Sequence, residues 1–171
     1  MRKELLAGLA AVGIGCSQTS SNSLISKVAN PQYKYLGIVI DGPLDYAQRT
    51  VQALQLIYSY DPANWVIIRN NVTAIRLNPP SKAHVDTGVL DTDANMETPS
   101  SYQSIYWVAG ELVHDAWHRE YYRKGEKYYG WEGEKKCMER QNEFFQKIGY
   151  QQLDIELMLQ TRYWEIEPRT W

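Results

Sequence analysis

Several features are scarce or missing in this chain of 171 residues, and each of them excludes a class of protein. It has two cysteines and two phenylalanines, and its 18 basic side chains nearly balance its 20 acidic ones. No basic stripe stands out along the sequence, so we expect no nucleic-acid partner. No apolar run reaches the roughly 18 residues that a membrane-spanning helix needs, so a permanent transmembrane anchor is disfavoured.

Length and residue balance fit one folded domain. Apolar residues make up 44% and charged residues 22% of the chain, which is typical of a globular protein and not of a disordered one. A chain of this length is too short for two comfortable cores. We therefore expect a single domain with a short appendage.

The N-terminal segment has the pattern of an export signal. A short basic start is followed by the apolar residues 5–14, then by Gly15 and Cys16, and then by a polar run. The stretch that ends at Cys16 resembles the processing box of bacterial lipoproteins, whose cysteine is acylated. The resemblance implies a signal peptide at residues 1–16, a tether at 17–32, a domain at 33–171 and a lipid-bilayer anchor in the cell envelope.

Two details extend the lipoprotein resemblance. Ser17 follows the cysteine, which in a Gram-negative host implies the outer membrane. Acylation of Cys16 would leave Cys137 as the remaining cysteine, so we expect no disulfide within the chain. Cys137 lies on an apolar stripe and is expected to be a small core side chain.

The hydrophobic pattern of the domain predicts a mixture of strands and helices. Continuous or alternating apolar runs predict strands at residues 35–40, 72–77 and 85–90. Helical spacing and start signals predict helices after Pro43, at Asp61-Pro62, from Ser100 or Ser101, at 134–148 and at 154–163. A loop is expected at residues 121–133.

Two histidines on the helix after Ser101 are the strongest chemical signal. His114 and His118 are four residues apart, where neighbouring side chains on a helix can bind one ion. They lie opposite the apolar stripe of that helix, which runs from Ile105 to Ala116. The pair therefore predicts a divalent-metal site, with zinc as the expected ion. The alternative is a solvated helix face.

A third ligand is expected from the following helix. Glu134 lies in the middle of an apolar stripe, where a carboxylate is costly unless it is compensated, so we predict Glu134 as the ligand. Gln141 lies on the same stripe and is expected to hold a ligand in place. Glu139, with Glu143 behind it, is the alternative ligand, although it points to the other side of the helix. Glu134 could also be an ordinary acid at a helix start.

The segment from Glu111 to His118, followed by that from Glu134 to Gln141, resembles the two-helix core of small zincin-type metallopeptidases. In their H-E-x-x-H motif the residue after the first histidine is a general base for metal-bound water. Asp115 stands at that position here, one methylene shorter. The resemblance implies an α+β fold in which a small sheet rests on the metal helix, and a zinc-dependent hydrolase of peptide-like bonds.

Two other functions stay open. Residues 112–116 also resemble the His-Asp segment of HD-type phosphohydrolases, with His84 and Asp154 in the outer ligand positions, but that family is all-helical. The other is a metal-stabilised lipoprotein that binds an envelope component without catalysis, which the Asp115 departure favours. Outside these functions, His84 is expected to be a loop residue. Glu111 is expected to be a helix-surface acid, and the alternative is a carboxylate that supports a metal ligand.

Overall fold

The computed structural model describes residues 32–93, 105–151 and 153–157. Cys16, residues 17–31 of the expected tether and the expected helix cap at Ser100 or Ser101 lie outside these ranges, whereas Gln32, the last residue of that tether, begins the first strand. The elements, in chain order, are β1 (Gln32–Tyr35), β2 (Ile38–Asp41), α1 (Leu44–Tyr60), α2 (Pro62–Asn71), β3 (Ala74–Leu77), β4 (Lys82–His84), β5 (Val89–Thr92), α3 (Ile105–Arg123) and α4 (Gly130–Lys147).

The fold is α+β, as the sequence predicts. Five strands form one mixed sheet in the order β1-β2-β3-β5-β4. The central pairs β2–β3 and β3–β5 are parallel, and the two edge strands are antiparallel to their neighbours. The register aligns Ile40, Ile75 and Leu90 across the three central strands, and all three are fully buried, so this row forms the sheet side of the core.

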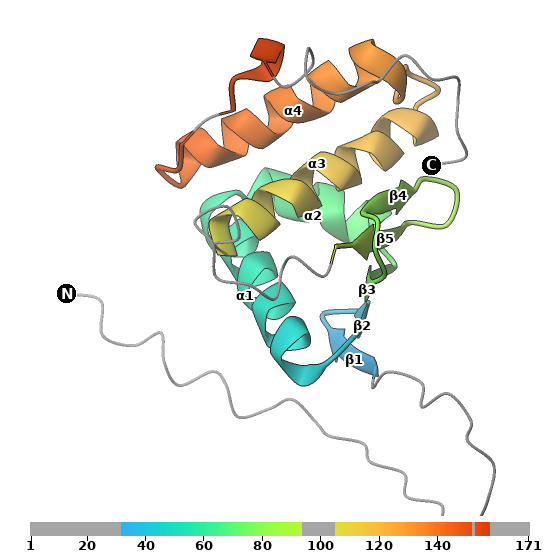
Figure 1. Ribbon diagram of the computed structural model, residues 1–171, viewed down its shortest axis with the longest axis vertical. Coiled ribbons are helices and arrows are strands. Elements are labelled where there is room, and N and C mark those ends of the chain that lie inside the picture. Colours follow the sequence, from blue (N-terminus) through green and yellow to red (C-terminus); the bar gives the residue numbers. More distant parts are fainter. Residues whose placement is uncertain (1–31, 94–104, 152, 158–171) are drawn as a thin grey trace, which may run out of the picture.

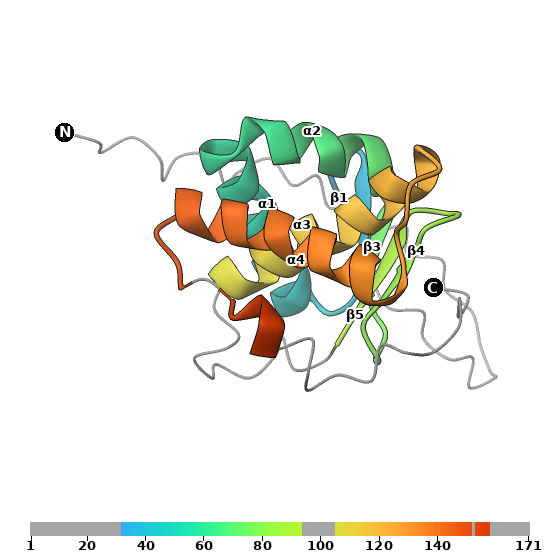
Figure 2. The same cartoon turned by 90° about the horizontal axis from the view of Figure 1, so that it is seen from above.

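Helix α3 is the centre of the helical part. It packs against α1 and α2, against the edge strand β4, and against α4. Figure 1 shows α4 running along α3 on the side away from α1, and Figure 2 shows the same two helices overlapping when seen from above. Among the described residues, α4 covers the side of α3 that faces away from α1. No helix among the described residues is both long enough and apolar enough to cross a membrane.

The start of α2 shows how the sequence ends one helix and begins the next. Asp61 caps α2 by accepting a hydrogen bond from the backbone N–H of Asn64, and Pro62 occupies the first turn. The same buried carboxylate accepts from Lys147 at the end of α4, at 2.8 Å. This ion pair ties the far end of α4 to the helical layer beneath it.

Three boundaries predicted from the sequence are wrong. The apolar run 35–40 is not one strand, because Leu36 and Gly37 both have positive φ and form a two-residue hairpin turn between β1 and β2. Residues 85–90 do not form one strand either, because the chain turns before Gly88, which has a φ of +75°. The loop predicted at 121–133 is shorter, because α3 continues to Arg123 and α4 begins at Gly130.

The last predicted helix is only partly described. Residues 155–157 are helical, and residues 158–163 of the segment predicted at 154–163 lie outside the described residues. Asp154 begins the helical residues by accepting a hydrogen bond from the backbone N–H of Leu157, at 3.0 Å.

Candidate metal centre

Helix α3 presents its apolar stripe to the core and its histidines to α4. The stripe predicted from the sequence is confirmed, since Val108, Ala109, Leu112 and Ala116 are buried in the core cluster. His114 and His118 lie on another face of the helix, as predicted, but α4 covers that face. Their side chains keep only 15% and 10% of their exposure, so the pair is not a solvated helix face.

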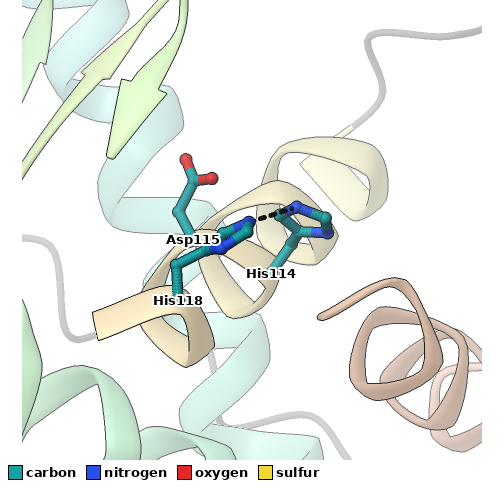
Figure 3. Close-up of side chains that lie close together, drawn as sticks. All are labelled: His114, Asp115 and His118. Atoms are coloured by element: carbon teal, nitrogen blue, oxygen red, sulfur yellow. Dashed lines mark hydrogen bonds between the residues drawn. The ribbon is translucent and has the colours of Figure 1, made fainter. Parts of the chain in front are cut away.

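Both imidazoles and one carboxylate converge between α3 and α4. The Nε2 atoms of His114 and His118 are 2.9 Å apart. Glu134 places one carboxylate oxygen 3.2 Å from Nε2 of His114 and the other 3.4 Å from Nε2 of His118. Figure 3 shows the two rings turned toward each other from successive turns of α3. The structure therefore brings together the three residues that the sequence predicts as ligands.

The carboxylate of Glu134 is buried, with 2% of the residue exposed. Burial by itself raises the pKa of a carboxyl, but the interactions with His114 and His118 outweigh it and lower the pKa of Glu134 to about 2. Glu134 is therefore ionised inside the protein, and positive charge must face it. Either a protonated imidazole or a bound cation provides that charge.

A backbone hydrogen bond fixes the orientation of His118. Its Nδ1 donates to the carbonyl oxygen of Tyr128 at 2.6 Å, in the connection between α3 and α4. With one proton held on Nδ1, Nε2 is the nitrogen that points at His114 and Glu134, and it can bind a metal once it is deprotonated. Metal-ligating histidines characteristically use their second ring nitrogen in this way.

The donor set and its spacing fit zinc. In a tetrahedral zinc site with metal–ligand bonds of about 2.0 to 2.1 Å, neighbouring donor atoms lie roughly 3.3 Å apart. The Nε2–Nε2 distance of 2.9 Å is a few tenths of an ångström shorter than that value, and the distances of 3.2 and 3.4 Å, which go to two different oxygens of Glu134, are close to it. Two imidazole nitrogens and one carboxylate oxygen are also the ligands of a common catalytic zinc site, which keeps a fourth position open.

Asp115 approaches the histidine pair from another direction. One carboxylate oxygen of Asp115 and one nitrogen of each histidine lie within 4.8 Å of one another. In Figure 3 the carboxylate stands on the side of the rings away from α4. Burial raises the pKa of Asp115, His118 lowers it, and Glu111 and Glu134 raise it, so that the pKa is about 7. The carboxyl is thus positioned to exchange a proton near neutral pH.

The other residues of α4 singled out in the sequence fall into two groups. Glu139 and Glu143 are exposed, and Glu143 forms an ion pair with Arg140, so the alternative ligand set is not assembled. Gln141 is buried, with its amide against Gly110, one turn before His114. Its expected role in holding a ligand stays a prediction.

Cys137 is fully buried, as predicted, and it interacts with His118. Burial raises the pKa of the Cys137 thiol, and His118 acts in the opposite direction. The same contact affects the protonation of His118. Burial lowers the pKa of this imidazole, but Cys137 and Glu134 outweigh burial and hold the pKa well above its usual range. In the metal-free protein His118, together with His114, therefore provides positive charge to Glu134.

The outer ligands implied by the HD-type resemblance are used elsewhere. Nε2 of His84 lies 2.8 Å from the buried carboxylate of Asp91, which also accepts from Asn78. His84 thus belongs to strand β4 and not to a loop as expected, and Asp154 caps the helical residues after it. Neither joins the group formed by His114, Asp115 and His118 within the described ranges.

Sequence reasoning missed the backbone of Tyr128 as a partner of His118. A carbonyl group carries no residue-type signal, and the connection was expected to be a longer loop. Comparison of the chain with protein-family models, with curated proteins and with solved structures gave no match in any of the three.

Proposed function

We propose that this protein is a zinc-dependent hydrolase of peptide-like bonds. One observation carries the proposal: a buried, ionised glutamate on α4 meets the Nε2 atoms of two histidines on α3, at the spacing of zinc ligands. A metal-free arrangement of this kind needs a trapped imidazolium, whereas a zinc ion would neutralise the glutamate and use all three donors.

The roles of the residues follow from their positions. His114, His118 and Glu134 would hold the zinc, which supplies Lewis acidity and makes a bound water acidic near neutral pH. Asp115 would take a proton as general base, because its carboxylate lies beside the histidine pair. The Tyr128 carbonyl keeps His118 in the required tautomer.

The edge of the sheet supports an extended peptide as the substrate class. Strand β4 is an edge strand and packs against α3, the helix that carries the histidines. Among the described strands β4 has a neighbour on one side only, so an extended peptide could pair with its outer side, as in β-strand addition. A mixed sheet with such an edge beside the metal helix is consistent with the zincin-type resemblance, and we propose a zincin-like fold on this basis.

The location of the enzyme rests on the N-terminal pattern. Acylation at Cys16 would anchor the domain to the bilayer of the cell envelope, with the polar residues 17–32 as a tether. Peptides or cross-linked envelope components would then be the accessible substrates. In a Gram-negative host Ser17 favours the outer membrane.

The test compares zinc-loaded and chelator-treated protein on a peptide library and on cell-wall peptides. We expect slow hydrolysis that is lost with the metal and regained when zinc is added back. Asp115→Asn should retain zinc and lose about 10²- to 10⁴-fold in rate, which is the usual contribution of a general base. Equal rates with and without zinc would contradict the proposal.

A second candidate function is a metal-stabilised binding lipoprotein without catalysis. It is favoured by Asp115 itself, since the side chain is one methylene shorter than the glutamate of the zinc-peptidase motif. Such a protein would bind zinc through the same three residues and cut no substrate. The two functions differ in hydrolysis and not in metal content.

A further inference from the structure

We propose that Gly133 is a positioning residue of the metal centre: because it has no side chain, the Tyr128 carbonyl can reach Nδ1 of His118 and set the direction of Nε2. This role rests on the proposed metal centre. Gly133 itself would contact neither the metal nor a substrate. It would act on the orientation of the His118 ring, which is already set before any metal binds.

The steric basis is the contact between the first turn of α4 and the connection that precedes it. A Cβ atom built on Gly133 would overlap the carbonyl carbon of Tyr128 and lie 2.8 Å from its carbonyl oxygen. These are backbone atoms, so they cannot rotate away as the end of a long side chain could. Any other residue at this position would push the Tyr128 carbonyl from its present place.

Backbone conformation does not explain a glycine here. Gly133 is helical, and its φ is not among the positive values found at Gly125 and Gly130 in the same part of the chain. A glycine inside a helix is destabilising relative to alanine, so local helix propensity disfavours it. The close approach of Tyr128 is the remaining reason that the structure offers for its presence.

The displaced carbonyl is the one that His118 uses. Nδ1 of His118 donates to it at 2.6 Å, and this bond leaves Nε2 as the nitrogen that faces His114 and Glu134. Without the acceptor, the imidazole could carry its proton on Nε2, where it would block a metal. Gly133 thus acts on the centre through Tyr128 and then through His118.

The neighbouring position in sequence makes the arrangement compact. Gly133 directly precedes Glu134. One turn of α4 therefore supplies the carboxylate and also leaves the space that the Tyr128 carbonyl occupies. A shift of that turn would therefore change two of the three expected ligands together.

Nitrogen NMR of the imidazoles tests the proposal without metal. In metal-free wild-type protein at alkaline pH, where the imidazoles are neutral, His118 should carry its proton on Nδ1. Gly133→Ala should give a mixture of the two tautomers. A wild-type His118 protonated on Nε2 would overturn the proposal, whatever the protein does with zinc.

Zinc titration gives the second readout. Gly133→Ala should bind zinc about 10- to 100-fold more weakly, the usual effect of removing an outer-shell partner. The matched control is Gly125→Ala, since a Cβ there meets nothing within 4 Å, and its positive φ makes the substitution strained. This control should lower the melting temperature and leave both the zinc affinity and the His118 tautomer unchanged. Unchanged affinity and tautomer in Gly133→Ala would contradict the proposal.

A second variant covers the case in which Gly133→Ala does not fold. Replacing the amide between Tyr128 and Tyr129 by an ester makes the same carbonyl a poorer acceptor and adds no atoms. Zinc affinity should fall and the proportion of the Nδ1 tautomer should decrease, and no change in either would overturn the proposal. A wild-type protein that binds no zinc would instead refute the proposed function, while the tautomer measurement would still decide the role of Gly133.

Discussion

A carboxylate oxygen of Glu134 lies 3.2 Å from Nε2 of His114, and the two residues come from different helices that pack side by side. The contact is buried, so it depends on the alignment of α3 with α4. It is also the contact that favours Glu134 over the exposed Glu139 as the proposed third ligand.

Removal of any one of the three ligands should reduce zinc binding. His114→Ala, His118→Ala and Glu134→Ala should each lower metal occupancy, as measured on the purified protein after desalting. They should also abolish the zinc-dependent rise in melting temperature, which corresponds to about 2.7 kcal/mol at a free zinc concentration 100 times Kd.

The matched control for Glu134→Ala is Glu139→Ala, on the exposed side of the same helix. It should leave zinc occupancy and the zinc-dependent shift in melting temperature as they are in the wild type. Equal zinc loss from both glutamate variants would show that the effect comes from the helix and not from a ligand.

Zinc affinity should rise with pH around neutrality. In the metal-free protein, burial lowers the pKa of His118, but Cys137 and Glu134 outweigh it and hold the pKa well above the usual range. Zinc must therefore displace a proton from His118, and affinity should increase by up to about tenfold per pH unit until the imidazole is deprotonated. Competition with a chromophoric chelator at several pH values measures this slope, and a flat profile would argue against His118 as a ligand.

The stability of the metal-free protein should show the opposite trend. Since the pKa of His118 is raised on folding, its contribution is fully present below the unfolded value of 6.5 and is lost as pH rises through the folded pKa. The pKa of Glu134 is lowered to about 2, so its contribution is present above 4.5 and is lost as pH falls toward 2. Thermal melts with chelator should therefore show stability declining on both sides of a weakly acidic maximum.

Asp115→Glu separates the hydrolase from the binding protein. The substitution supplies the reach of the H-E-x-x-H motif and keeps the charge, so the slow hydrolysis expected of the wild type should increase. Zinc content serves as the control and should not change. A zinc-loaded protein that is inert both as wild type and as Asp115→Glu, on peptide and cell-wall substrates, would support the binding function.

Cys16→Ser tests the envelope anchor. The wild-type chain should incorporate labelled fatty acid and sediment with membranes, because two or more acyl chains anchor stably where a single chain does not. The variant should lose the label and remain unprocessed. Normal processing and sedimentation of the variant would refute acylation at Cys16.

The candidate site could be predicted largely because its signals are local. The spacing of His114 and His118 fixes their mutual position on any helix, and the charge of Glu134 on an apolar stripe requires a partner. Neither inference needs the tertiary fold. Their meeting depends only on α3 and α4 packing through the faces that the sequence patterns define.

The features that escaped prediction depend on backbone geometry. An apolar run containing Leu36 and Gly37 looks like one strand, although two positive φ values turn it into a hairpin. Every residue has a backbone carbonyl, so the sequence does not single out that of Tyr128. The requirement for Gly133 arises from a contact between two segments. Such contacts cannot be read from periodicity or residue type.

The most direct test of the central claim is the zinc content and coordination of the full chain, purified in detergent and loaded with zinc. Metal analysis should give one zinc per chain. X-ray absorption should show two imidazole nitrogens and one carboxylate oxygen, with any remaining position filled by a light atom and no sulfur from Cys137. A protein that retains no zinc after desalting, or a zinc ion whose shell lacks the two imidazoles, would contradict the metal centre proposed for His114, His118 and Glu134.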